Sequence, residues 1–161
     1  MKIILLGEAM GLFMANEAGE LCQAENFTAS IAGAEYNVAV GLSRLGHTPA
    51  YCTRLGDDSI GQRIRLGMRS NGIDESLVTT APGELTGLMF KSFTTQGDPD
   101  IAYYRRGSAA SKITPEDIDR LDLCGCGRLH VTGIFPAVSP SALSSVRRLI
   151  SRAQTLNIPF S

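Results

Sequence analysis

Residues 31–46 read IAGAEYNVAVGLSRLG, a pattern typical of a helix that begins next to a glycine. Val38, Leu42 and Leu45 recur at the i, i+4 and i+7 spacing of an apolar helix face. Gly46 occupies the position where a helix commonly ends in a left-handed residue. We therefore expect a helix from residue 33 to residue 45.

The start of this helix is also a candidate binding site. A glycine lets a ligand approach the backbone closely, and the N–H groups of a first helical turn lack partners within the helix. The Asn37 side chain can both donate and accept a hydrogen bond, which suits a hydroxyl group. A second interpretation stays open, in which Gly33 serves only a tight turn and Asn37 only caps its own helix.

The composition limits the classes of protein to consider. The chain has 161 residues, of which 43% are hydrophobic, enough for one domain with a real core. Its formal net charge is -1, which gives no electrostatic reason to expect a nucleic-acid or membrane-surface partner. No apolar run reaches membrane-spanning length, and the first run meets Glu8 too soon for a signal peptide. We therefore expect a cytoplasmic protein that begins with a buried strand.

Four cysteines raise the question of a metal or redox site. Cys22 and Cys52 stand alone, whereas Cys124 and Cys126 form a CxC pair. A structural zinc site normally takes its ligands from two closely spaced pairs, and this sequence has one. We expect reduced thiols and no metal site, with a metal or redox function of the CxC pair as the weaker alternative.

Strands and helices alternate through most of the chain, which predicts a parallel α/β layer. Apolar runs predict core strands at 2–6, 50–55 and 128–132, and a further strand begins at 158–160. Helices are expected at 60–71, 111–122 and 139–157. In the last helix, periodicity directs Leu143, Val146, Ile150 and Ala153 inward. We assign residues 1–8, 33–83 and 107–161 to this layer.

Two insertions, 9–32 and 84–106, break the alternation with β-rich sequence. The first predicts two or three short strands, and the second predicts a hairpin from 88–94 and 101–105 around a Gly-Asp-Pro turn. We expect the insertions to pair with each other into one small sheet, a β lid on the α/β layer.

Glycines follow three of the expected core strands, at Gly7, Gly56 and Gly133. Because ligands of an open parallel sheet bind beyond the carboxyl ends of its strands, these glycines are expected to leave that edge open for a ligand. Each is equally compatible with an ordinary turn between a strand and a helix.

The second insertion ends in Tyr103-Tyr104-Arg105-Arg106. On a strand, Tyr103 and Arg105 share one face, and an aromatic ring beside a guanidinium can form a pocket wall for a ligand with an acidic group. Arg105 could equally protect an edge strand against aggregation. The sequence has neither a Gly-x-x-x-x-Gly-Lys-Ser/Thr loop nor a Gly-x-Gly-x-x-Gly motif, and no catalytic base stands out.

These motifs together resemble a known family. The segments 33–39 (GAEYNVA) and 56–61 (GDDSIG) resemble the ribokinase-like carbohydrate kinases of the PfkB type, and 103–111 (YYRRGSAAS) with 130–134 (HVTGI) is similar to their 2-keto-3-deoxygluconate kinase branch. Glu35 stands where many fructokinases have proline, which favours that branch. The resemblance covers essentially the whole chain, but only the N-terminal half of the family's length.

The resemblance implies a three-layer α/β/α fold, here truncated, with a small β lid. It implies transfer of the γ-phosphate of ATP, with Mg²⁺, to a hydroxyl of a sugar acid, and dimerisation through the lid. By similarity, substrate contacts fall on Gly33, Ala34, Asn37, Phe90, Tyr103, Tyr104 and Arg105. The catalytic Asp and the nucleotide pocket belong to the family's later half, so we expect no catalytic residue in this chain and no kinase activity of the fragment.

Three other functions stay open on the sequence alone. One is a fructokinase or another sugar kinase of the same fold. Another is a sugar-binding or dimerisation module without catalysis. The third is the metal or redox protein considered above.

Overall fold

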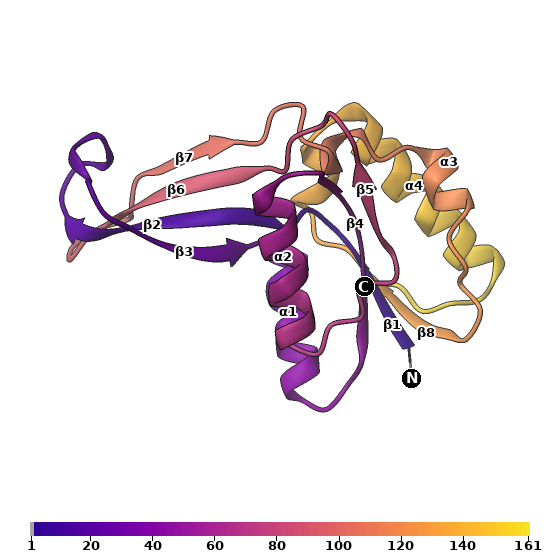
Figure 1. Cartoon of the computed structure of the whole chain (residues 1–161). Coiled ribbons are helices and arrows are strands. Elements are labelled where there is room, and N and C mark those ends of the chain that lie inside the picture. Colours follow the sequence, from indigo (N-terminus) through magenta and orange to yellow (C-terminus); the bar gives the residue numbers. More distant parts are fainter. Residues whose placement is uncertain (1) are drawn as a thin grey trace.

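Two four-stranded sheets form the β structure of the computed structural model, which describes residues 2–161 (Figure 1). The first sheet is parallel and has the order β5-β4-β1-β8: β1 (Lys2–Leu6), β4 (Pro49–Gly56), β5 (Val78–Ala81) and β8 (Cys126–His130). The second sheet has the order β3-β2-β6-β7: β2 (Met10–Ala18), β3 (Phe27–Ala32), β6 (Leu88–Phe93) and β7 (Ile101–Tyr104).

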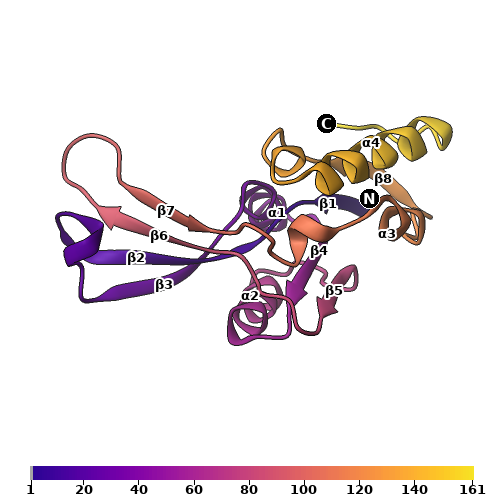
Figure 2. The same cartoon turned by 90° about the horizontal axis from the view of Figure 1, so that it is seen from above.

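Helices cover the parallel sheet on both faces and give it three layers (Figure 2). One face carries α1 (Ala34–Arg44) and α2 (Ser59–Ser70), and the other carries α3 (Pro115–Asp119) and α4 (Pro140–Thr155). Short 3₁₀ turns are η1 (Leu21–Gln23), η2 (Ala110–Lys112) and η3 (Phe135–Ala137). The expected α/β/α architecture is confirmed.

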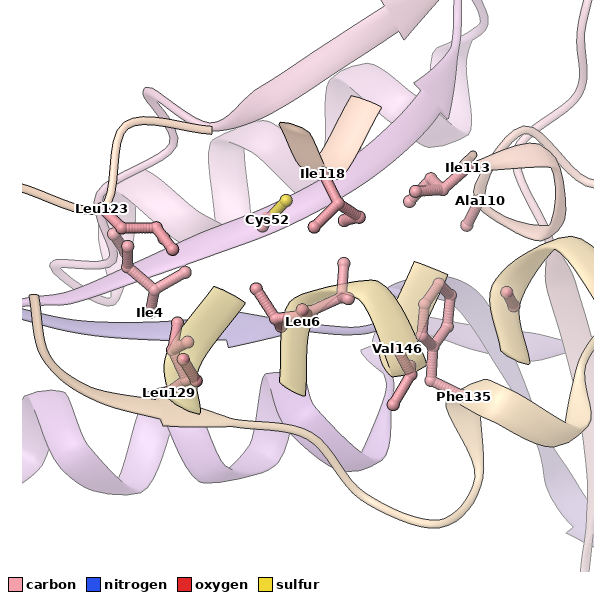
Figure 3. Close-up of a cluster of buried hydrophobic side chains, with 14 residues drawn as sticks. Ile4, Leu6, Cys52, Ala110, Ile113, Ile118, Leu123, Leu129, Phe135 and Val146 are labelled. Carbon is pink, nitrogen blue, oxygen red and sulfur yellow. The ribbon is translucent and has the colours of Figure 1, made fainter. Parts of the chain in front are cut away.

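Strand β1 shows why both faces need cover. Its side chains alternate, so Ile3 and Leu5 belong to the core under α1 and α2, while Ile4 and Leu6 belong to the core under α3 and α4. Figure 3 shows the second core, in which Ile4 and Leu6 meet side chains of α4 and the α3 segment. A strand that is buried on both faces has a continuous apolar sequence, and this pattern identified β1 in the sequence.

The second sheet projects away from the three layers (Figure 1). Strand β2 pairs with β3 antiparallel and with β6 parallel, and β6 pairs with β7 antiparallel. The two insertions therefore form one sheet, as predicted. We call this sheet, β3-β2-β6-β7, the lid.

Two predicted helix faces are right only in part. In α1, Val38 and Leu42 pack against the core as predicted, but the fully buried residues are Glu35, Tyr36 and Ala39, and Leu45 caps the helix and is 77% exposed. In α4, Val146, Ile150 and Ala153 do face the core, whereas Leu143 is 37% exposed. The periodicity of large apolar residues missed the small and polar members of these faces, such as Glu35 in α1 and Ala142 and Ser145 in α4.

Helix ends and the last residues follow the predictions more closely. Gly46 has φ +84 after α1, and Thr114 with Asp117 forms a capping box at the start of α3. Phe160 makes a parallel bridge to Leu129, so a strand does begin beside β8. The short edge strand β5 was not predicted, although Val78-Thr79-Thr80 is β-branched. Within residues 2–161 no helix has the length and hydrophobicity needed to cross a membrane.

Candidate sugar site at the base of the lid

Glu8 lies at the junction of the two sheets, where the chain leaves β1 for β2, and is only 3% exposed. Its Oε2 accepts a hydrogen bond of 2.8 Å from Nε of Arg105 and forms an ion pair with Nη2 of the same guanidinium. Its Oε1 accepts a hydrogen bond of 2.5 Å from Oγ of Ser108. The carboxylate therefore ties the end of β1 to the chain that returns from β7.

Burial sets the protonation of this carboxyl group. Loss of solvent raises the pKa of Glu8, the Ser108 hydrogen bond and the Arg105 charge oppose this, and the nearby Glu35 charge adds to it. The net effect leaves the pKa of Glu8 above its ordinary value of 4.5. The short ion pair with Arg105 is therefore partly offset by the cost of burying the charge.

A second buried carboxylate, Glu35, lies in the first turn of α1. One of its oxygens accepts from the backbone N–H of Thr132 at 3.0 Å and from Oγ1 of Thr132 at 2.6 Å. Glu35 therefore joins the start of α1 to the segment that follows β8. In the sequence, Glu35 stood out only because many fructokinases have proline at this position.

Close packing around the two glutamates requires glycine at two positions. A Cβ at Gly7 would collide with the Glu35 carboxylate. Gly33 has φ +154, and a Cβ there would lie 2.7 Å from the backbone oxygen of Glu8. A Cβ at Gly133, by contrast, meets nothing within 4 Å, so only this strand-end glycine leaves open space.

Tyr103 and Arg105 lie together, as predicted, although β7 ends at Tyr104 and Arg105 directly follows it. The Cζ atom of Arg105 is 5.9 Å from the centroid of the Tyr103 ring. Both residues line a cavity of about 870 Å³ that extends to Gly133 and also contains Arg106 and Lys112. This cavity therefore offers three cationic side chains and one phenol ring to a ligand.

Phe90 and Tyr104 lie on the opposite face of the lid. The Phe90 ring packs 5.2 Å from Phe13, 5.3 Å from Phe27 and 5.8 Å from Tyr104, measured between centroids. Phe90, Tyr103 and Tyr104 also line a neighbouring cavity of about 810 Å³. Both tyrosines therefore line this cavity, although they lie on different faces of β7.

The start of α1 lies apart from the cavity at Arg105. Gly33 precedes the helix, Ala34 is its first residue, and the exposed Asn37 lines a different cavity of about 650 Å³ with Tyr36 and Asn71. The structure therefore brings Tyr103 and Arg105 together but does not bring Asn37 into their cavity. A role of these residues in substrate binding stays a prediction.

The sequence did not single out Glu8 or Ser108. The available signal was a carboxylate directly after a fully apolar strand, where a buried charge requires a partner. The partner lies 97 residues away in the chain, which no local pattern encodes. Among the described residues, no three His, Cys, Asp or Glu side chains gather as metal ligands would.

The chain matches the model of the pfkB family carbohydrate kinases over residues 1–159. A 2-dehydro-3-deoxygluconokinase of Bacillus subtilis is 42% identical over 137 residues, which is 84% of this chain and 42% of that protein. Fructokinase-1 of Zea mays is 32% identical over 118 residues, or 73% of this chain and 36% of that protein. The chain thus spans less than half the length of these curated relatives.

Solved structures agree with the family match. The crystal structure of a PfkB protein from Polaromonas sp. JS666 superposes with a TM-score of 0.93 at 39% identity, covering 99% of this chain and 54% of that one. The shared fold includes the lid as well as the three layers, because nearly the whole chain superposes. The chain belongs to the pfkB family of carbohydrate kinases.

Proposed function

We propose that this chain supplies the sugar-binding half of a kinase that phosphorylates a hydroxyl of a sugar acid such as 2-keto-3-deoxygluconate. The observation that supports the proposal is Arg105, a 21%-exposed cation that lines a cavity beside Tyr103. A guanidinium binds a carboxylate through two parallel hydrogen bonds, which a neutral sugar cannot offer. The 2-dehydro-3-deoxygluconokinase among the relatives is consistent with this substrate class.

The chain's own residues would bind and orient the sugar. In the proposal Arg105 holds the carboxylate, and Tyr103 covers the sugar from the lid. Gly33, Ala34 and Asn37 contact sugar hydroxyls once the lid has moved toward α1, and Phe90 and Tyr104 contact the sugar through the neighbouring cavity that they line with Tyr103. Holding the accepting hydroxyl in one position is the contribution to catalysis that such residues make.

ATP with Mg²⁺ would supply the phosphoryl group. We assign no residue of this chain to ATP, Mg²⁺ or the catalytic base, because residues 2–161 contain no cluster of metal-ligating side chains and the sequence has no phosphate-binding loop. The described residues therefore offer no set that fits ATP with Mg²⁺, and we derive no catalytic step through these groups.

A fructokinase is the second candidate, because fructokinases occur among the relatives at lower identity. Fructose lacks the carboxylate that Arg105 would bind, so the two candidates differ in their dependence on this one side chain. Titration of the purified chain with 2-keto-3-deoxygluconate and with fructose, followed by NMR, tests the proposal. Shifts at Tyr103 and Arg105 with the sugar acid only are expected; shifts with fructose only would overturn the assignment.

We also propose a homodimer formed through the lid and a cytoplasmic location. The aromatic side chains of Phe13, Phe27, Phe90 and Tyr104 gather on one lid face, and Tyr104 is 63% exposed. A second lid would cover this face. The cysteines are all free, which suits a reducing compartment.

A further inference from the structure

The guanidinium of Arg105 is held along one edge only. Glu8 Oε2 engages Nε and Nη2, which uses two of the five N–H groups. Within the described chain no other acceptor bonds this side chain. Three N–H groups therefore remain unbonded, two on Nη1 and one on Nη2, on a side chain that lines the cavity with Tyr103.

Glu8 itself has little freedom to move. Ser108 occupies its other oxygen at 2.5 Å, and the side chain is 2% exposed. The backbone at Gly87 packs so closely that a Cβ there would lie 2.6 Å from Glu8 Oε1 and 3.4 Å from Cβ of Arg105. The chain entering β2, the chain entering β6 and the chain leaving β7 all meet at this carboxylate.

We infer that Glu8 is a positioning residue for sugar-acid recognition: it fixes the Arg105 guanidinium so that the remaining N–H groups present a preformed fork to the ligand carboxylate. Ser108 fixes Glu8 in turn. This inference rests on the proposed sugar-acid function and adds to it the residue that determines how Arg105 is oriented. An unrestrained Arg would lose several side-chain rotations on binding, whereas a held one has already lost them.

Glu8 also has an effect that weakens binding of the ligand carboxylate. Its negative charge partly neutralises Arg105, so its removal leaves a cation that attracts the ligand more strongly but is no longer held. Salt separates the two effects, because at about 0.5 M the Debye length falls to about 4 Å and weakens long-range attraction, while loss of orientation persists. The test is therefore made at high salt.

The test compares dissociation constants of 2-keto-3-deoxygluconate for the purified chain and four variants, measured by NMR titration. Glu8→Gln keeps the shape of the side chain, and we expect it to weaken binding about tenfold. Ser108→Ala should weaken it by a smaller factor. Arg105→Ala should weaken binding at least as much as Glu8→Gln, and adding Glu8→Gln to Arg105→Ala should change nothing further, because Glu8 acts through Arg105.

Arg65→Gln is the matched control. Arg65 is 24% exposed and forms an ion pair of 3.6 Å with Glu75, and neither residue lines the cavities at Tyr103 and Arg105. It should reduce thermal stability without changing the dissociation constant of the sugar acid. Equal weakening by Arg65→Gln and Glu8→Gln would show a general structural effect and overturn the inference.

A ligand-free measurement keeps the two proposals separable. The Nε–H of Arg105 should exchange slowly with water in the unmodified chain and rapidly in Glu8→Gln. If exchange changes in this way but no sugar acid binds, the proposed function fails while the positioning by Glu8 stands. If the sugar acid binds and Glu8→Gln leaves either the exchange or the affinity unchanged, the role of Glu8 is refuted and the sugar-acid function stands.

Discussion

Replacing Arg105 by alanine should change substrate choice more than any other single substitution in this chain. Arg105 lines the cavity beside Tyr103, and in the proposed complex it donates charge-assisted hydrogen bonds to the ligand carboxylate. A hydrogen bond to a charged group contributes about 1.5–3 kcal/mol, and each 1.4 kcal/mol is about a factor of ten. Binding of 2-keto-3-deoxygluconate should therefore weaken at least about tenfold.

The same substitution affects folding, and this effect has to be measured separately. It leaves Glu8 buried with Ser108 as its remaining partner, and breaking a buried ion pair costs about 3–5 kcal/mol. Protonation of Glu8 reduces this cost, because its pKa is already raised by burial and loss of Arg105 raises it further. We expect a lower midpoint of thermal unfolding, and we expect Arg105→Lys to recover part of it by keeping the charge.

The assay is a titration of folded Arg105→Ala with the sugar acid and with fructose, at a temperature where circular dichroism shows the native spectrum. The acid should lose affinity at least about tenfold, and fructose should change by less than about twofold, because it has no carboxylate to lose a partner. Small and equal changes for both sugars would refute the sugar-acid assignment and leave Arg105 as a structural residue just after the edge strand β7.

Four further predictions follow from the structure. The purified 161-residue chain should release no ADP from ATP in the presence of 2-keto-3-deoxygluconate, and measurable phosphorylation of the sugar would contradict our assignment of no catalytic residue to it. Sedimentation should show a dimer at micromolar concentration that Phe27→Asp dissociates; a monomer at all concentrations would refute the lid interface. The pKa of Glu8 is raised in the folded state, so between the unfolded and the folded pKa only the folded chain binds this proton. The contribution of Glu8 to the free energy of unfolding is therefore largest below about pH 4.5 and falls as pH rises through the folded pKa. Glu8→Gln should remove this pH dependence, as measured by urea titrations. Thr132→Val removes the 2.6 Å hydrogen bond to buried Glu35 and should lower the free energy of unfolding by about 1–3 kcal/mol, whereas Thr132→Ser should restore most of it.

The parts of the fold that the sequence predicted are those with local causes. An apolar run such as Lys2–Leu6 identifies a strand covered on both faces, and the capping box of Thr114 and Asp117 marks a helix start within four residues. The lid was predictable because turn residues separate its strands. Its pairing order, with β2 parallel to β6, joins segments more than seventy residues apart and became visible only in the structure.

The candidate site was predictable only in part, for a related reason. The alternation of a strand placed Tyr103 and Arg105 on one face, and their contact at 5.9 Å agrees with it. The residues that hold Arg105 in place, Glu8 and Ser108, come from either side of the lid and meet only because the chain enters and leaves that sheet at one point. Pattern analysis therefore found the residues that we propose to contact a ligand and missed those that orient them.

The two buried carboxylates show how the base of the lid is built. Glu8 connects β1 to the chain leaving β7, and Glu35 connects α1 to the segment after β8, so each bonds a part of the molecule distant in sequence. Neither carboxylate could be buried without these bonds, because an unpaired charge away from water is too costly. A Cβ at Gly7 would strike the carboxylate of Glu35, and a Cβ at Gly87 would strike that of Glu8. Gly7, which the sequence suggested as part of an open ligand edge, therefore makes room for Glu35, while the packing around Glu8 holds the lid against the parallel sheet and fixes the one cation proposed to recognise the substrate.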